Sequence, residues 1–275
     1  MRDYVALTLR AAPPDRLEVE GLTADRCAEL SAHEIAHLSV WTGARRASVG
    51  DFFDVRGERA SCLRVEGSLA RVDGLAAGNA GGEVIIDGDA GARVGASMTG
   101  GRVEVRGAVG HEAGLAMGGG VLRVHGDAGD RLGSATAGAS KGMTGGEIVV
   151  AGAAGADAAV HMRRGLVVIG GHAGENVGRA MIAGSVIVLG RVGAAAGRGN
   201  RRGSIIAVGT IEVPQTYRYA CTFEPPHVRL TMTYLRRRYG LLIDDAVVSG
   251  RYRRYCGDAG EPGKGEILAY CSTSP

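Results

Sequence analysis

The sequence lacks the features of a membrane protein, a disulfide-bonded protein and a metal-cluster protein. No apolar run approaches the roughly 18 residues that a transmembrane helix needs, and the segment 1–4 does not begin a signal peptide. The five cysteines include no Cys-x-x-Cys pair, which disfavours zinc fingers and iron–sulfur ligation. Reduced thiols are the default state of such cysteines in the cytosol. The sequence therefore predicts a cytoplasmic protein.

Signatures of nucleotide and nucleic-acid binding are missing as well. The formal net charge is only +3, and the basic residues are scattered through the chain rather than interleaved with aromatic residues along one stripe. No Gly-x-x-x-x-Gly-Lys-Ser/Thr phosphate loop is present, and we interpret Gly263–Gly265, the nearest glycine–lysine segment, as a turn. No nucleic-acid partner is therefore expected.

What the sequence does contain is a glycine-rich repeat. A segment of the form Gly-x-aliphatic-x-aliphatic-x-Gly occurs seven times, at a spacing of 19 residues with one spacing of 26. The copies begin at Gly82, Gly101, Gly120, Gly146, Gly165, Gly184 and Gly203. The alternating aliphatic residues predict a short strand, and the second glycine predicts a tight corner. A repeat of this kind is typical of a solenoid, in which each copy buries its apolar face against its neighbours.

The composition of the repeat decides which solenoid is expected. Each interior glycine would cost a helix about 1 kcal/mol, so near-regular glycine columns exclude helical repeats. One column holds five methionines, with asparagine before and after it: Met98, Met117, Met143, Met162 and Met181, between Asn79 and Asn200. We expect these methionines to stack about 4.8 Å apart as a buried ladder rather than to bind metal. The predicted fold is mainly β, a right-handed parallel β-helix with 19-residue rungs.

Three parts are expected along the chain. Residues 1–45 form a small α/β N-terminal cap, with strands near 4–9 and 17–19 and a helix that begins at Thr23. Residues 46–212 form the glycine-rich β-helix, with less regular rungs at 51–57 and 61–67 before the strict repeats. Residues 213–275 abandon the repeat and form an irregular C-terminal latch and interaction segment, with a helix from His227 to Tyr239. Both ends are expected to cover the open strand edges of the coil.

The most recognisable site motif is His33–His37, which matches the His-Glu-x-x-His pattern of zinc hydrolases. A third ligand is missing, because the longer form of the motif needs glycine at position 40 and histidine at position 43, where this chain has Val40 and Gly43. We favour an amphipathic turn with Ile35 and Leu38 packed inward, and a zinc hydrolase stays as the alternative. No catalytic residue and no metal ligand is predicted.

One copy of the repeat is longer than the others, by seven residues around Ala135 to Gly142. Insertions in repeat proteins map to loops on one face, and such loops often bind partners. A neutral surface insertion is the alternative, since lengthening a loop costs little closure entropy. We interpret the segment as an interaction loop.

The repeat pattern resembles a domain shared by the C-terminal part of the glutamate synthase large subunit and the C subunit of formylmethanofuran dehydrogenase. The flanking segments resemble the pattern of that C subunit: Leu30–Leu38, Gly50–Gly57, Tyr255–Asp258 and Gly263–Leu268. The similarity therefore spans almost the whole chain. Within that family, an Ala/Arg-rich composition with only Lys141 and Lys264 as lysines favours the formyltransferase/hydrolase complex of methylotrophic bacteria.

This resemblance implies a function, partners and cofactors. It implies a cytoplasmic complex of one-carbon metabolism that moves a formyl group from tetrahydromethanopterin to a methanofuran-type carrier and hydrolyses it to formate during formaldehyde oxidation. An amidohydrolase subunit would hold the metals, a formyltransferase subunit the transferase site, and this chain would be the non-catalytic β-helical scaffold without a cofactor of its own. The alternatives are the C subunit of a true formylmethanofuran dehydrogenase and a stand-alone glutamate-synthase-type scaffold.

The resemblance also implies a binding site for the carrier. Methanofuran-type carriers have a glutamate-rich tail, which arginine side chains can hold by charge-assisted hydrogen bonds. The candidates are Arg236, Arg237, Arg238, Arg251, Arg253 and Arg254. The alternative interpretation of these residues is a solvated basic face.

Overall fold

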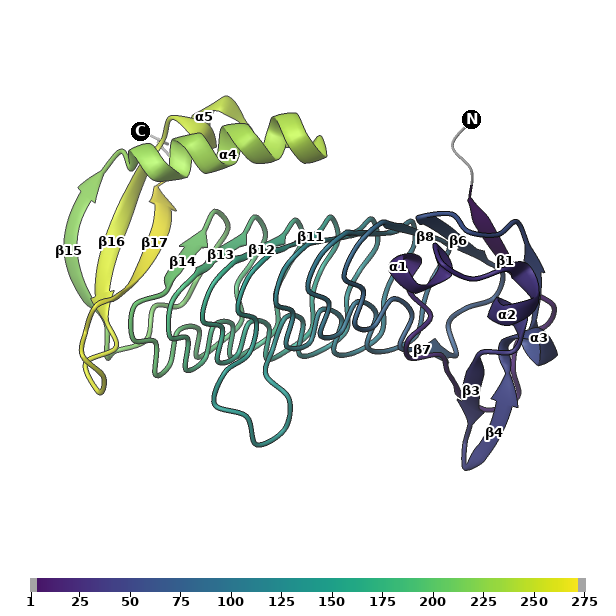
Figure 1. The fold of residues 1–275 in the computed structure, drawn as a ribbon. Helices are drawn as coiled ribbons and strands as arrows, with labels where there is room; N and C mark the ends of the chain where they lie inside the picture. Colours follow the sequence, from purple (N-terminus) through teal and green to yellow (C-terminus); the bar gives the residue numbers. More distant parts are fainter. Residues whose placement is uncertain (1–3, 272–275) are drawn as a thin grey trace.

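The structure is a computed structural model that describes residues 4–271 and is mainly β (Figure 1). Residues 1–3, part of the segment tested for a signal peptide, and residues 272–275 of the predicted latch lie outside the described residues. The large sheet has thirteen strands: β1 (Val5–Leu9), β5 (Phe53–Arg56), β6 (Cys62–Glu66), β8 (Glu83–Asp87), β9 (Arg102–Val105), β10 (Val121–Val124), β11 (Glu147–Val150), β12 (Leu166–Ile169), β13 (Ser185–Val188), β14 (Ser204–Ala207), β15 (Arg218–Phe223), β16 (Arg251–Gly257) and β17 (Gly265–Cys271). Their order in the sheet is β15-β16-β17-β14-β13-β12-β11-β10-β9-β8-β6-β1-β5.

The seven repeats form the strands from β8 to β14, which pair in parallel and in register. Val84 lies opposite Val103, and Val103 lies opposite Leu122, so equivalent residues of successive copies stack. A second parallel ladder of single bridges runs beside the sheet, for example from Ala173 to Val192. Figure 1 shows the resulting stack of coils. The strands and the in-register stacking predicted from the repeat are confirmed.

Close approach between coils explains the second glycine of the repeat. A Cβ atom added to Gly190 would lie 2.5 Å from the carbonyl oxygen of Gly171 in the preceding coil. A contact that short is impossible without moving the backbone, so the column from Gly107 to Gly209 requires glycine because of neighbouring backbone, whereas Gly88 in the first copy has a positive φ of 117°.

The methionine column is buried along its whole length. All five methionines of the column have no exposed surface, and neither do Asn79 and Asn200 at its two ends. The Asn79 Oδ1 atom accepts a hydrogen bond from the Ala24 N–H at 3.0 Å, and the Asn200 Oδ1 atom accepts one from the Gly203 N–H at 2.7 Å. A buried side-chain amide without a hydrogen-bond partner would lower the free energy of unfolding, and these hydrogen bonds avoid that loss. The predicted methionine ladder is confirmed.

The N-terminal end of the sheet differs from the prediction. Strand β5 follows the helix α3 (Val49–Phe52) and pairs antiparallel with β1, with Leu7 opposite Val55, so residues 51–57 are not a rung of the coil. Strand β1 pairs in parallel with β6 and takes the place that a preceding rung would occupy. The N-terminal strand therefore covers the open edge of the coil, as expected of a cap.

Strands of the cap and the short strand β7 from the start of the coil form a second, smaller sheet. It consists of β2 (Leu17–Glu18), β3 (Ser39–Thr42), β4 (Arg45–Ser48) and β7 (Val72–Asp73) in the order β4-β3-β2-β7. The helices α1 (Ala24–Cys27) and α2 (Ala32–Ala36) are each about one turn long. The helix predicted to begin at Thr23 is thus present but short.

The C-terminal segment returns to the coil, contrary to the prediction that it abandons the repeat. Strand β17 pairs in parallel with β14, and Ile267 lies opposite Ile205. Gly265 is therefore not part of a free turn, because it begins a further copy of the strand pattern. Strands β16 and β15 then add antiparallel to this edge of the sheet.

The helix α4 (Pro226–Tyr239) matches the predicted helix closely and lies along the outer face of the sheet (Figure 1). Its side chains Val228, Met232 and Leu235 pack on an outward column that is continuously apolar only in the later coils. That column consists of Val149, Val168, Ile187, Ile206 and Leu268. The same position in earlier coils holds Ile85, Glu104 and Arg123, so the continuous apolar stripe decides where the helix lies.

Candidate functional site

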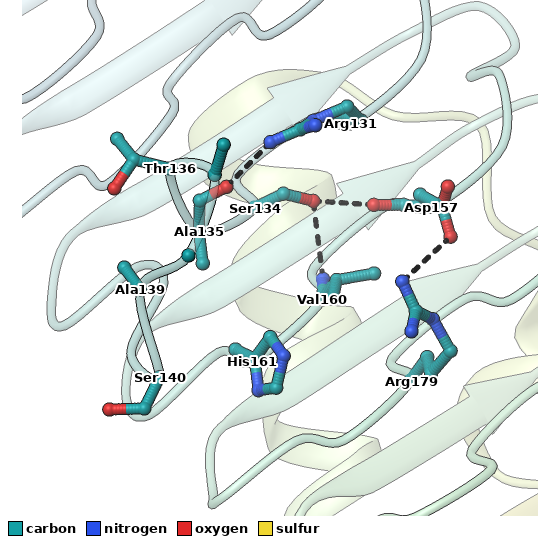
Figure 2. Close-up of a pocket in the computed structure, with 12 residues that line it drawn as sticks. Arg131, Ser134, Ala135, Thr136, Ala139, Ser140, Asp157, Val160, His161 and Arg179 are labelled. Carbon is teal, nitrogen blue, oxygen red and sulfur yellow. Dashed lines mark hydrogen bonds and ion pairs between the residues drawn. The ribbon is translucent and has the colours of Figure 1, made fainter.

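The lengthened repeat builds a hollow on the side of the coil away from α4. Figure 1 shows its loop projecting from the stack of coils. The hollow has a volume of about 410 Å³ and lies between this loop and the next coils (Figure 2). It is lined by Arg131, Ser134, Asp157, Val160, His161 and Arg179 together with loop residues 135–140.

Hydrogen bonds hold both ends of the loop. The Arg131 Nη2 atom donates to the carbonyl oxygen of Ala135 at 2.8 Å, where the loop leaves the coil. The Gly142 N–H donates to the carbonyl oxygen of His161 at 2.8 Å, where the loop returns. Between these anchors, residues 136–138 are exposed. The loop therefore has a firm base and an accessible tip.

The polar groups of the hollow are mostly engaged with each other. Ser134 is 2% exposed, and its hydroxyl donates to the carbonyl oxygen of Asp157 and accepts from the Val160 N–H at 3.3 Å. Arg131 pairs with Glu112 at 3.3 Å. These hydrogen bonds of the Ser134 hydroxyl are thus to backbone groups, rather than to a base that would activate a nucleophile.

A second ion pair crosses the floor of the hollow, between Arg179 and Asp157 at 3.6 Å (Figure 2). His161 lies beside it, between the loop and Arg179. Four of the lining residues, Arg131, Asp157, His161 and Arg179, were not among the predicted site residues. The sequence signal that marks their position is the 26-residue spacing, because the lengthened copy lies beside the coils that contain them.

The His-Glu-x-x-His motif forms the short helix α2 at the other end of the molecule. Its Glu34 carboxylate accepts hydrogen bonds from the Ser31 N–H at 2.8 Å and the Ser31 hydroxyl at 2.7 Å. These bonds from Ser31 hold the pKa of Glu34 below its usual range. Ile35 has no exposed surface, and Leu38 is partly buried. The Glu34 carboxylate therefore caps the N-terminal end of α2. This role agrees with the interpretation of the motif as an amphipathic turn.

No three His, Cys, Asp or Glu side chains within residues 4–271 gather in a way that could hold a metal ion. The two imidazole rings of the motif lie with their centroids 4.2 Å apart and their planes tilted by 50°, and the His37 Nδ1 atom lies 2.7 Å from the carbonyl oxygen of His33. The motif's histidines thus contact each other and the backbone.

Among residues 4–271, no helix is long and apolar enough to cross a membrane.

The six arginines predicted for the carrier lie in two separate places. Arg236, Arg237 and Arg238 are in the last turn of α4. The Arg123 side chain of β10 donates a hydrogen bond to the carbonyl oxygen of Tyr239 in that turn at 2.8 Å, so the turn lies beside β10. The other three belong to β16. Strand β16 is six strand positions from β10, which corresponds to about 29 Å.

Two of these arginines are already paired. Arg236 contacts Asp245, and Arg254 contacts Glu266 at 2.8 Å. Side chains alternate between the two faces of β16. Tyr252 packs toward α4, so Arg251 and Arg253 point to the opposite face. The structure does not bring the six side chains together into one site.

Comparisons with known proteins identify relatives of this chain. No protein-family model matches it. It is 33% identical over 95 residues to the C subunit of molybdenum-containing formylmethanofuran dehydrogenase 1 from Methanosarcina barkeri. It is 34% identical over 88 residues to the C subunit of the formyltransferase/hydrolase complex Fhc from Methylorubrum extorquens. Each match covers about a third of this chain and a third of the relative, 32% in the first case and 33% in the second.

A solved structure extends the similarity from end to end. A chain in the crystal structure of the formyltransferase/hydrolase complex FhcABCD from Methylorubrum extorquens, determined in complex with methylofuran, superposes with a TM-score of 0.89. The two chains are 35% identical, and the match covers 97% of this chain and 99% of the other. This chain belongs to the C-subunit family of these complexes. The family resemblance predicted from the repeat and its flanks is confirmed.

Proposed function

We propose that the chain is the C subunit of a formyltransferase/hydrolase complex. In this proposal the complex moves a formyl group from tetrahydromethanopterin to a methanofuran-type carrier and hydrolyses it to formate, within formaldehyde oxidation. The observation that carries the proposal is the end-to-end match, at 35% identity, to a chain of FhcABCD. The presence of methylofuran in that structure supports a carrier of the methanofuran type.

We infer that the coil is a right-handed parallel β-helix. Two parallel ladders in each repeat, one of paired strands and one of single bridges, support a closed coil rather than a flat sheet. The right hand follows from the strong preference for right-handed crossovers between parallel strands. With it we propose the division into a cap (1–45), a β-helix (46–212) and a latch (213–275), except that β5 pairs with the cap strand β1 and β17 of the latch continues the coil.

The proposed role of the chain is a non-catalytic scaffold in the cytoplasm. The amidohydrolase subunit, with its metals, and the formyltransferase subunit would bind to the outside of the coil. The apolar interior supports this role, because methionine and aliphatic side chains occupy it. Carrier binding by Arg236–Arg238 and by Arg251, Arg253 and Arg254 stays part of the proposal, now as two separate surfaces.

A second candidate is the C subunit of a true formylmethanofuran dehydrogenase. The 33% identity to the Methanosarcina barkeri protein favours it, since this value is close to the 34% found for the Fhc protein. The two candidates differ in metal content, because the named dehydrogenase contains molybdenum. A stand-alone glutamate-synthase-type scaffold is the third possibility and differs from both in its partners.

Native purification tests the proposal. The chain is tagged in its own host, the assembly is purified without crosslinking, and the bound proteins are identified by mass spectrometry, with an untagged strain as control. We expect amidohydrolase and formyltransferase subunits in fixed ratio and no molybdenum in the assembly. Recovery of molybdenum with redox subunits would favour the dehydrogenase, and recovery of the chain alone would contradict both.

A further inference from the structure

The charge of the coil changes sign along its length. Residues 60–140 contain seven Lys and Arg against nine Asp and Glu, whereas residues 141–202 contain eight basic residues against three acidic ones. The mild net charge of the chain hides this difference, which amounts to a shift from a net −2 to a net +5. The change falls at the insertion loop, where the two halves meet.

The repeat places most of these cations on one surface. Arg163 and Arg164 follow Met162 directly, and Arg201 and Arg202 follow Asn200 in the same way. Because the methionine column stacks in register, both pairs occupy the two columns next to it. Backbone hydrogen bonds show the stacking: the Arg163 N–H donates to the Met143 carbonyl and the Arg201 N–H to the Met181 carbonyl, both at 2.8 Å. Cations that look scattered along the sequence are therefore gathered by the fold.

Three further cations border the same columns, each two residues before a buried methionine or asparagine. They are Lys141, Arg179 and Arg198. The Ala180 N–H donates to the Arg198 carbonyl at 2.8 Å, which places the coils of Arg179 and Arg198 side by side. All seven side chains are exposed. We call this set, Lys141, Arg163, Arg164, Arg179, Arg198, Arg201 and Arg202, the basic surface.

Little within residues 4–271 neutralises the basic surface. Only two ion pairs of the described residues involve it, Arg179 with Asp157 at 3.6 Å and Arg201 with Glu261 at 3.2 Å. The corresponding positions in the earlier coils are neutral: Ala77, Ala80, Gly81, Ala96, Thr99, Gly100, Leu115, Gly118 and Gly119. The charge is thus a property of four neighbouring coils and not of the repeat.

The chemistry of the surface favours carboxylates over nucleic acid. Six of its seven cations are arginines, whose planar guanidinium groups bind carboxylates in a bidentate manner. No Phe, Tyr or Trp occurs between residues 54 and 216, so the surface offers no aromatic ring on which a base can stack. Four coils span about 14 Å, which matches about four residues of an extended peptide.

We propose that the basic surface, bordered by the insertion loop, is a docking site for an acidic polypeptide segment of a partner protein. The loop and the hollow at its base form one wall of the site, and the arginine columns form its floor. The segment lies along the coil axis, with its carboxylates paired to successive coils. This inference does not depend on the proposed function, because it concerns binding to the full chain alone.

Fluorescence anisotropy on the full-length chain tests the inference. The probe is a fluorescein-labelled oligoglutamate peptide, compared with an oligoglutamine peptide of equal length and with single-stranded oligo-dT. We expect only the oligoglutamate to bind. The double variant Arg163→Glu/Arg164→Glu should weaken it by about tenfold or more, since it removes two charge-assisted contacts and adds repulsion.

The matched control is Arg45→Glu/Arg46→Glu, which makes the same change of charge on the exposed strand β4. It should change the affinity less than about twofold, because these residues lie outside the proposed site. Unfolding temperatures verify that both variants fold, and the neutral pair Arg163→Gln/Arg164→Gln replaces the first variant if it does not. Equal losses in the test and control variants, or equally tight binding of oligo-dT, would overturn the inference.

Discussion

The hydroxyl of Tyr239 donates a hydrogen bond to the carboxylate of Glu147, which joins the last turn of α4 to the first residue of β11. The hydroxyl of Tyr234 donates to the same carboxylate at 2.9 Å. Burial, and then the contact with Glu147, raises the pKa of Tyr239 well above its usual range. The phenol therefore stays a donor, and the end of the helix is held where the outward apolar stripe begins.

Removing this hydroxyl should destabilise the protein. We expect Tyr239→Phe to lower the free energy of unfolding by about 1–2 kcal/mol, because a half-buried carboxylate loses one of its two tyrosine donors. Urea unfolding followed by circular dichroism measures the change. Tyr219→Phe is the control: its side chain is 59% exposed, so the loss should be within about 0.5 kcal/mol. A similar loss in both variants would show that the Glu147 contact contributes little.

The apolar stripe under α4 predicts a difference between two isoleucines of the same column. Ile187 has no exposed surface and contacts the α4 cluster, whereas Ile85 lies in an earlier coil beyond the helix and is only partly buried. Ile187→Ala should cost about 2–5 kcal/mol, because it leaves a cavity under the helix. Ile85→Ala should cost clearly less. Equal costs measured by urea unfolding would mean that the helix does not depend on this stripe.

The methionine ladder should be sensitive to truncation at its centre. Met143 has no exposed surface, so Met143→Ala should lower the free energy of unfolding by about 2–5 kcal/mol. Met143→Leu keeps most of the volume and should cost less than about 1.5 kcal/mol. If the alanine variant were as stable as the leucine variant, the ladder would be loosely packed. The same unfolding experiment compares both.

Asp258 predicts a change of stability in acid. Burial alone would raise the pKa of its carboxyl group, but hydrogen bonds from the Gly199 and Gly260 N–H groups and from Thr216 hold it below the usual value of 3.8. A lowered folded-state pKa stabilises the protein fully above the unfolded value, and this contribution is lost as the pH falls through the folded value.

Comparison with Asp258→Asn isolates that contribution. The difference in unfolding free energy between the wild-type protein and the variant should be constant above about pH 5 and shrink at lower pH, below the usual carboxyl pKa. Urea unfolding at a series of pH values measures it. A difference independent of pH down to the acid transition of the wild-type protein would contradict the assignment.

The insertion loop predicts a separable effect on partners. Deletion of residues 135–141 restores the 19-residue spacing, because Gly133-Ser134 is then followed by Gly142-Met143 as in the other copies. The free energy of unfolding should change by less than about 1 kcal/mol, since loop length affects closure entropy only weakly. Native purification should then recover fewer partner subunits. An intact assembly with the deleted chain would identify the loop as a neutral insertion.

Much of the fold is readable from the repeat, because its information is local and periodic. The strands beginning after Gly82 to Gly203 and the buried methionine column follow from spacing alone, and the structure has both. The prediction of a rung at 51–57 is wrong because the pattern of this segment resembles a rung, although its actual partner is the antiparallel β1. The strand that begins at Gly265 escapes prediction because a long intervening segment separates it from the previous copy.

The candidate site was less predictable, because its residues come together only through stacking. The insertion could be located from its spacing, but the pairs of Arg131 with Glu112 and Arg179 with Asp157 join different coils. The arginine clusters at 236–238 and 251–254 are close in sequence, yet the last turn of α4 contacts β10, six strand positions from β16. Proximity along the chain was therefore a poor guide to proximity in space.

The sequence by itself determined the coil, because each 19-residue copy contains its own strand, corner and core side chains, and similar copies stack in register. Only the tertiary structure decided how the coil is closed and what it presents. Strands β1 and β17 join its ends through pairings between distant segments. The basic surface and the hollow arise because stacking brings residues one or more repeats apart within a few ångströms of each other.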